Sequence, residues 1–173
     1  MLRPFRASDY PAVSDTREHP ETAPWVNALA DPDGTAMETA VEAARRAGRL
    51  LYLIAADPDT DDYLGEILVF RRTDEVAETA TGEIAYTVAP AARGRGIATN
   101  GVRLLSGWAF RELRVQRLQI SIHPDNASSL RVAEKAGYTR EGLVRSVKLI
   151  RGERVDVIRY SALPNEIPDA YGA

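Results

Sequence analysis

Cysteine is absent from the sequence, and this absence excludes disulfide bonds, thiolate metal sites and a cysteine nucleophile. Long apolar runs are also missing, since none approaches the roughly 18 residues that a membrane-spanning helix needs. Arg3 and Arg6 lie close to the first residue, but no apolar segment follows them as it would in a signal peptide. We therefore expect a cytoplasmic protein with no membrane partner.

A strong charge of either sign is missing as well. The net charge is −3 at pH 7 and the isoelectric point is near 5.5, which argues against nucleic acid as the main partner. Two acidic clusters, at 57–62 and 74–81, are interpreted as exposed loops. Their spacing does not gather carboxylates as metal ligands, so no metal site is expected.

The length and apolar content are sufficient for one folded domain. The chain has 173 residues, of which 45% are hydrophobic, and this is enough for a single core. We place the domain at 1–163. Residues 164–173 contain two prolines and a glycine and are expected to form a loose tail. Both a monomer and a homodimer are compatible with the sequence.

Hydrophobic periodicity and turn residues predict the element order β-α-α-β-β-β-α-β-α-β-β. Strands are expected at 2–5, 50–55, 63–71, 83–88, 117–122, 138–150 and 154–162. Ser8 or Asp9 is expected to cap the first helix, and a capping box of Thr35 and Glu38 to open the second. This order predicts an α/β domain with one mixed sheet of six or seven strands.

The stretch 82–113 organises the chain, because it reads as strand, glycine-rich turn and helix. The turn is Arg93-Gly94-Arg95-Gly96-Ile97-Ala98. Glycines at alternate positions leave backbone amides uncovered where the helix begins, and such a helix start binds anions. The alternative is a loop that needs glycine for its dihedral angles, with solvated arginines beside it. The turn is neither a Walker A loop nor a complete GxGxxG fingerprint, because Thr99 replaces the third glycine.

The turn resembles the pyrophosphate-binding signature of the GNAT acyltransferases, Gln/Arg-x-x-Gly-x-Gly/Ala, with Arg93, Gly96 and Ala98 at its defined positions. The segment 126–138 resembles the second signature of that superfamily, in the form typical of the branch that acetylates N-terminal amines of ribosomal proteins. The opening segment 2–9 is similar to that branch too. The resemblance spans residues 1–163 and is weakest at 19–34.

This resemblance implies a mostly antiparallel mixed sheet flanked by about four helices, with splayed central strands between which acetyl-CoA inserts. It also implies that the backbone N–H near Val88 faces the thioester oxygen and that Asn126 faces the pantetheine arm. The residues expected to bind acetyl-CoA are Val88, Arg93, Gly94, Arg95, Gly96, Ile97, Ala98, Thr99 and Asn126.

Two residues are candidates for the chemistry. Glu83 begins the central strand, in Glu-Ile-Ala-Tyr, which resembles the base-bearing strand of related enzymes. We expect Glu83 to act as the general base through a water molecule. The alternative interpretation of Glu83 is an exposed carboxylate at the end of a strand. Many superfamily members carry a tyrosine near the CoA sulfur, where this chain has Ala133. Ser129 lies one helical turn earlier, on the same face, and is the candidate that assists the leaving thiolate. A tyrosine introduced at Ala133 is expected to replace Ser129 in part.

The acceptor is less defined by the sequence. The expected reaction is direct transfer of an acetyl group to a primary amine, by preference a protein or peptide N-terminus. A small amine such as an antibiotic, a polyamine or an amino acid is the alternative acceptor, and an acyl-CoA-binding module without turnover is another possible function. Trp25 is a candidate for the acceptor pocket or, alternatively, an aromatic that covers the core. His19 and His123 match no signature position.

Overall fold

The structure is a computed structural model that describes residues 1–29, 34–72 and 80–167. Its seven-stranded sheet has the order β1-β2-β3-β4-β5-β7-β6. The strands are β1 (Leu2–Pro4), β2 (Leu50–Ala56), β3 (Tyr63–Arg72), β4 (Thr81–Val88), β5 (Arg117–Ile122), β6 (Thr139–Ile150) and β7 (Glu153–Ala162). The helices are α1 (Tyr10–Glu18), α2 (Thr35–Arg46), α3 (Ile97–Glu112) and α4 (Ala127–Ala136). The predicted mixed sheet, mostly antiparallel, is confirmed.

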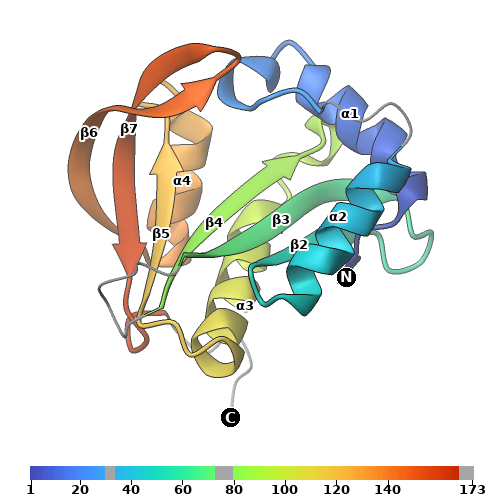
Figure 1. The fold of residues 1–173 in the computed structure, drawn as a ribbon. Coiled ribbons are helices and arrows are strands. Elements are labelled where there is room, and N and C mark those ends of the chain that lie inside the picture. The colour runs from blue at the N-terminus through green and yellow to red at the C-terminus, as the bar shows by residue number, and fades with distance from the viewer. Residues whose placement is uncertain (30–33, 73–79, 168–173) are drawn as a thin grey trace.

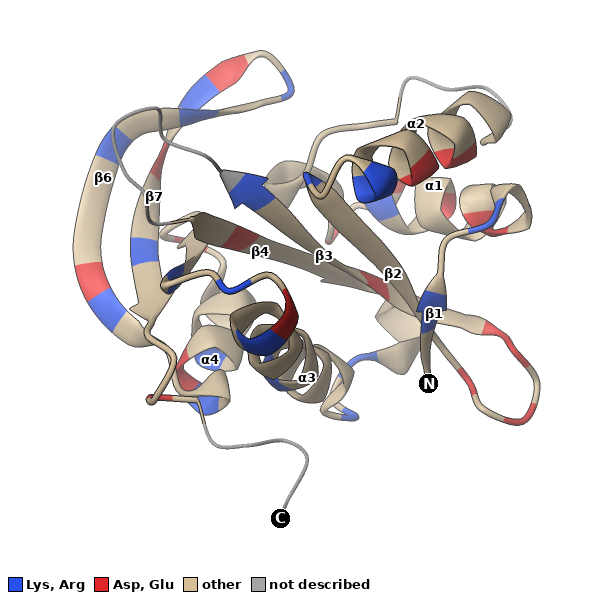
Figure 2. Cartoon of the chain, turned by 60° about the horizontal axis from the view of Figure 1, so that its bottom comes forward, with Lys and Arg blue, Asp and Glu red and all other residues tan. Residues whose placement is uncertain are grey.

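Helices cover both faces of the sheet, with α1 and α2 on one face and α3 and α4 on the other (Figures 1 and 2). Each face has its own cluster of buried side chains. The larger cluster lies under α3 and α4 and includes Ile84, Leu118 and Ile120. The smaller lies under α1 and α2, where Ala85 of β4 packs against it. Alternate residues of β4 therefore face opposite layers, as a half-buried strand requires.

Strands β4 and β5 are the only parallel neighbours among the described strands, and they separate early. Their pairing covers Thr81, Gly82 and Glu83 of β4, opposite residues 117–119 of β5. Beyond Glu83, β4 stays paired with β3 alone, and β5 continues beside β7. Figure 1 shows the two strands diverging upward. The expected splay of the central strands is present, and it leaves one edge of β4 without a partner among the described strands.

The two expected helix caps differ in the structure. Gly34, with φ 81°, and not Thr35, is the N-cap of α2. Glu38 instead accepts a hydrogen bond from the backbone N–H of Ala7 at 3.1 Å. Asp9 is the N-cap residue of α1, as one of the two alternatives predicted, but its carboxylate makes no capping bond with that helix. It accepts hydrogen bonds from Arg3 at 2.7 Å and from the backbone N–H of Arg6 at 2.9 Å. The carboxylates of Glu38 and Asp9 thus bind groups outside their own helices.

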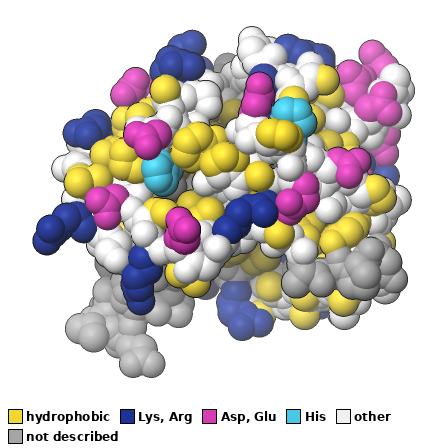
Figure 3. All heavy atoms as spheres, turned by 90° about the horizontal axis from the view of Figure 1, so that it is seen from above, with side chains coloured by type: hydrophobic (Ala, Val, Ile, Leu, Met, Phe, Trp, Pro, Cys, Tyr) yellow, Lys and Arg dark blue, Asp and Glu magenta, His cyan; other side chains and the backbone are white. Residues whose placement is uncertain are grey.

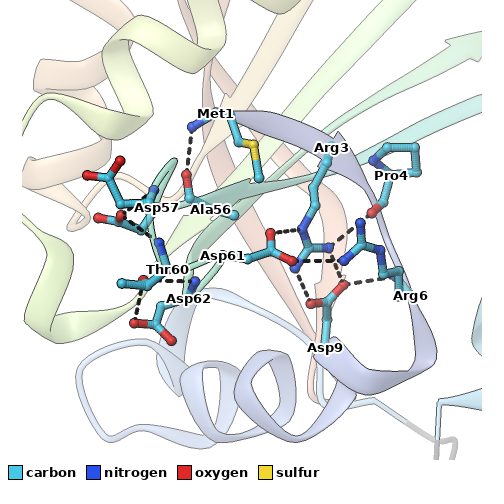
Figure 4. A network of polar contacts seen from close by, with 11 residues as sticks. Met1, Arg3, Pro4, Arg6, Asp9, Ala56, Asp57, Thr60, Asp61 and Asp62 are labelled. Atoms are coloured by element: carbon cyan, nitrogen blue, oxygen red, sulfur yellow. Dashed lines mark hydrogen bonds and ion pairs between the residues drawn. The ribbon is translucent and has the colours of Figure 1, made fainter.

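The exposed acidic loop after β2 forms ion pairs with the N-terminal segment (Figure 4). Asp61 accepts hydrogen bonds from Arg3 at 2.6 Å and from Arg6 at 2.8 Å. The guanidinium of Arg3 also binds the buried carboxylate of Asp9. The hydrogen bond from Arg3 lowers the pKa of Asp61 below its ordinary value. This network fixes β1 at the edge of the sheet.

One residue of the expected loose tail packs against the domain. Ile167 is 8% exposed and belongs to the cluster under α3 and α4, whereas residues 164–166 are exposed. The rest of the predicted tail, 168–173, and most of the second acidic loop lie outside the described residues. Within the described ranges, no helix is long and apolar enough to cross a membrane.

Candidate functional site

A pocket of about 450 Å³ lies where the end of β4 meets the starts of α3 and α4. Its walls come from four segments: the end of β4, the turn before α3, one side of α4, and a short 3₁₀ turn, η2 (Ala23–Trp25), with the two residues before it. The residues predicted to contact acetyl-CoA or the acceptor that line it are Trp25, Val88, Arg93, Gly94, Gly96, Ile97, Ala98, Thr99, Asn126 and Ser129. One cavity therefore gathers residues that are up to 104 positions apart.

The glycine-rich turn has the geometry that its sequence predicts. Gly94 and Gly96 adopt φ angles of 76° and 77°, in the left-handed region that favours glycine. Gly96 is the N-cap of α3, and the first i to i+4 bond runs from the amide of Asn100 to the carbonyl of Gly96 at 2.9 Å. The amides of the first turn thus have no helical acceptor and lie at the pocket wall. The two interpretations of the turn are therefore compatible: the glycines are needed for the backbone dihedral angles, and the free amides can bind an anion.

The guanidinium of Arg93 faces the η2 segment instead of the amides of the turn. It donates to Glu21 at 2.5 Å, to the buried Thr22 hydroxyl at 2.7 Å, and to the carbonyl of Val88 at 3.3 Å. These contacts join the turn to a segment more than 70 residues earlier in the chain. Arg95 is exposed and is not among the residues that line the pocket. The backbone of the turn therefore has the more direct access to a ligand.

Glu83 lies outside this pocket, at the last paired position before β4 and β5 separate. It shares the sheet face of Ala85, which packs under α1 and α2. Its carboxylate accepts hydrogen bonds from Ser121 Oγ at 2.8 Å and Gln119 Nε2 at 3.4 Å. Glu83 is half-buried. It is therefore more than a freely exposed carboxylate at the start of a strand, and it lies on the opposite side of the sheet from α3.

Asn126 and Ser129 lie together at the start of α4, and Asn126 begins this helix as the sequence predicts. Asn126 caps α4, and its side-chain oxygen accepts from the backbone N–H of Ser129 at 3.1 Å. The Ser129 hydroxyl lies 2.8 Å from the hydroxyl of Tyr86, on β4. Burial raises the pKa of Tyr86 well above its ordinary value. A phenol and an alcohol, both neutral, thus meet at the wall of the pocket.

Ala133 is not among the residues that line the pocket, and the partial replacement of Ser129 by a tyrosine at this position stays a prediction. Its side chain is 0% exposed and is part of the core under α3 and α4. Overpacking such a core position typically costs about 1–3 kcal/mol of stability. Tyr138 is also core: it is buried, and its hydroxyl lies 2.7 Å from Ser106 Oγ.

Trp25 lies between the pocket and the end of β5. Its indole N–H donates to the carbonyl of Glu21 at 3.0 Å, and its ring lies 5.2 Å from the His123 ring, tilted by 48°. Nδ1 of His19 accepts from the amide of Glu21 at 3.3 Å. Figure 3 looks down on this end of the molecule, where hydrophobic side chains lie between the two histidines. Trp25 thus lines the cavity and also contacts a neighbouring aromatic ring.

The pocket-lining residues that sequence reasoning missed include two cations and a tyrosine. Arg131 and Lys135 lie on α4, one turn apart, and bring two cations to the pocket wall. Their i, i+4 spacing beside the second signature could have indicated them. Tyr86 was assigned only to the strand pattern, and no local signal indicates a contact with a residue 43 positions away.

Comparison with known proteins identifies the family. Residues 1–139 match the family model described as the acetyltransferase (GNAT) domain. YjcK of Bacillus subtilis, described provisionally as an N-acetyltransferase, is 37% identical over 92 residues, which are 53% of this chain and 50% of YjcK. The chain thus spans about half the length of that relative.

Two other relatives match over most of the chain. YdaF of Bacillus subtilis, described provisionally as a ribosomal N-acetyltransferase, is 30% identical over 92% of this chain and 75% of its own length. The L-amino acid N-acetyltransferase AaaT of Escherichia coli is 26% identical over 90% of this chain and 93% of AaaT. The solved structure of Mycobacterium smegmatis RimJ in complex with CoA-disulfide has a TM-score of 0.82 and 22% identity, covering 97% and 83% of the two chains. With its splayed sheet, its glycine-rich turn and a family model that spans more than half of its length, this chain belongs to the GNAT acetyltransferase family.

Proposed function

We propose that this protein is an N-acetyltransferase that moves an acetyl group from acetyl-CoA to a primary amine by direct attack. The observation that carries the proposal is the pocket at the end of β4. It combines the free first-turn amides of α3, the unpaired edge of β4 and a serine hydroxyl. Each of these matches one part of an acyl-CoA molecule: pyrophosphate, pantetheine amides and thioester.

The pyrophosphate is assigned to the backbone amides from Gly94 to Thr99. The positive end of the α3 macrodipole and the uncovered amides favour a negative group there. Arg131 and Lys135 add positive charge from α4. The unpaired edge of β4 supplies main-chain groups for the pantetheine amides, much as a neighbouring strand would, and the N–H near Val88 is assigned to the thioester oxygen.

The amine approaches from the α1 and α2 face, where Glu83 lies. An N-terminal amine has a pKa of about 8 and a lysine amine about 10.4, so each must lose a proton before it attacks at neutral pH. We assign that proton to Glu83, through a water molecule. The nitrogen then bonds to the thioester carbon, the C–S bond breaks with its electron pair going to sulfur, and CoA leaves as the thiolate near Ser129.

A protein or peptide N-terminus is the proposed acceptor, supported by the match to YdaF over 92% of the chain. The match to the amino acid acetyltransferase AaaT supports a second candidate, a small α-amine such as a free amino acid. Both classes present an α-amine. They differ in whether a peptide chain follows it.

The test measures release of CoA thiol by the purified protein with three sets of acceptors: short peptides with free N-termini, the same peptides with blocked N-termini, and free amino acids. We expect turnover with free N-termini and a much lower rate with blocked ones. Turnover of amino acids alone would select the second candidate. Binding of acetyl-CoA with no turnover of any amine would contradict the enzymatic proposal and favour a binding module.

A further inference from the structure

The contact between Tyr86 and Ser129 joins two walls of the pocket. The phenol oxygen of Tyr86 lies 2.8 Å from Ser129 Oγ and 3.0 Å from the Ser129 carbonyl oxygen. Both residues line the cavity, Tyr86 from β4 and Ser129 from the first turn of α4. The Tyr86 ring packs against the core under α3 and α4, so its hydroxyl is held in place by a rigid neighbourhood.

The orientation of the serine hydroxyl depends on this phenol, because a phenol carries a single donor hydrogen. If Tyr86 donates to the Ser129 carbonyl, the serine proton points at Tyr86. If Tyr86 donates to Ser129 Oγ, the serine proton is free to point at another acceptor in the pocket. The second arrangement polarises the serine O–H, since hydrogen bonds in a chain strengthen one another.

We propose that Tyr86 is a positioning residue that donates to Ser129 Oγ and thereby directs the serine proton toward the sulfur of bound CoA. This rests on the proposed function of the pocket. The tyrosine hydroxyl beside Ser129 thus comes from β4, whereas α4 has a buried alanine at position 133.

No proton leaves Tyr86 in this arrangement. When the C–S bond breaks, its electron pair stays on sulfur, and the thiolate accepts a hydrogen bond from Ser129, which in turn accepts one from Tyr86. The proton lost by the amine leaves through Glu83. Burial raises the pKa of Tyr86, which keeps the phenol protonated and available as a donor across the neutral range.

The experiment titrates the thiol of CoA bound to the protein, following the ultraviolet absorbance of the thiolate, and needs no amine acceptor. A hydrogen-bond donor to sulfur favours the thiolate. The thiol of CoA should therefore have a lower pKa when bound to the wild-type protein than when bound to the Tyr86→Phe variant. We expect a rise of about 0.5 to 1 in that pKa on substitution, from the strength of one neutral hydrogen bond. Ser129→Ala should raise it at least as much.

The matched control is Tyr138→Phe. Tyr138 is also buried, and its hydroxyl also contacts a serine hydroxyl, but it lies in the core and does not line the pocket. Tyr138→Phe should leave the pKa of the bound thiol unchanged. The double variant Tyr86→Phe/Ser129→Ala should match Ser129→Ala, because Tyr86 acts through Ser129.

Three outcomes would overturn the inference. An unchanged thiol pKa in Tyr86→Phe, with CoA still bound, would remove the positioning role and leave the proposed function intact. A further rise in the double variant would show that Tyr86 acts independently of Ser129. Absence of CoA binding by the wild-type protein in calorimetry would overturn the proposed function and this inference together.

Discussion

Replacement of Gly96 by aspartate should abolish most acetyl-CoA affinity while the fold survives. Gly96 is the N-cap of α3 with φ 77°, and a Cβ at this position would meet only the side-chain nitrogen of Asn100, at 3.6 Å. No steric clash therefore opposes the substitution. The cost to folding is the left-handed backbone of a residue with a side chain, about 1 kcal/mol. For a chain of this length that lowers the melting temperature by about 2–4 °C.

The cost to binding is larger, because the new carboxylate lies where the pyrophosphate is proposed to bind. Two like charges about 4 Å apart repel by about 1 kcal/mol in water and about 4 kcal/mol at the reduced screening of a protein surface. Since each 1.4 kcal/mol corresponds to about tenfold in affinity, the expected loss is about 5-fold to 10³-fold. Isothermal calorimetry with acetyl-CoA measures this directly.

Two variants separate charge from backbone strain. Gly96→Ala carries the same strain without the charge and should lose much less affinity than Gly96→Asp. Gly48→Asp is the matched control for stability, because Gly48 has φ 65° and lies just after α2, away from the pocket, where a Cβ would meet no atom within 4 Å. Unchanged acetyl-CoA affinity in a folded Gly96→Asp protein would refute the assignment of the turn to the pyrophosphate.

Three further predictions concern the base, the leaving group and the N-terminal network. Glu83→Gln should lower the maximal rate by about 10²-fold at pH 7, with acetyl-CoA affinity retained and a smaller loss at higher pH, where the amine deprotonates unaided; a wild-type rate at pH 7 would make Glu83 structural. Ser129→Ala should lower the maximal rate by about 10-fold to 10²-fold with a smaller change in affinity, and an unchanged rate when chemistry limits turnover would show that solvent alone assists the thiolate. The pKa of Asp61 is lowered by Arg3, so this pair stabilises the fold above the ordinary aspartate pKa of about 3.9 and ceases to do so as pH falls through the lower folded value. The difference in urea midpoint between the wild-type protein and Asp61→Asn should therefore narrow between about pH 6 and about pH 3, and a constant difference would contradict the ion-pair origin.

Local sequence by itself determined most of the elements and the chemistry of the glycine-rich turn. Alternating apolar residues in 117–122 can be buried on one face only as a strand, and Leu118, Ile120 and Ile122 are buried together. Gly94 and Gly96 have the positive φ angles that their place in the turn predicts, and Asn126 caps α4 as its position before the helix predicts. These features depend on residues within about four positions of one another, so the sequence contains their causes.

Only the tertiary structure decided which side chains share the pocket. One face of α4 packs against the core and contains Ala133, whereas another face lines the cavity and contains Ser129. Arg93 binds Glu21 and Thr22, and Tyr86 reaches Ser129, across more than 40 positions in each case. Such contacts arise from the strand order and from the separation of β4 and β5 beyond Glu83. Pairing between distant segments is a property of the whole sheet, and no local pattern in one sequence specifies it.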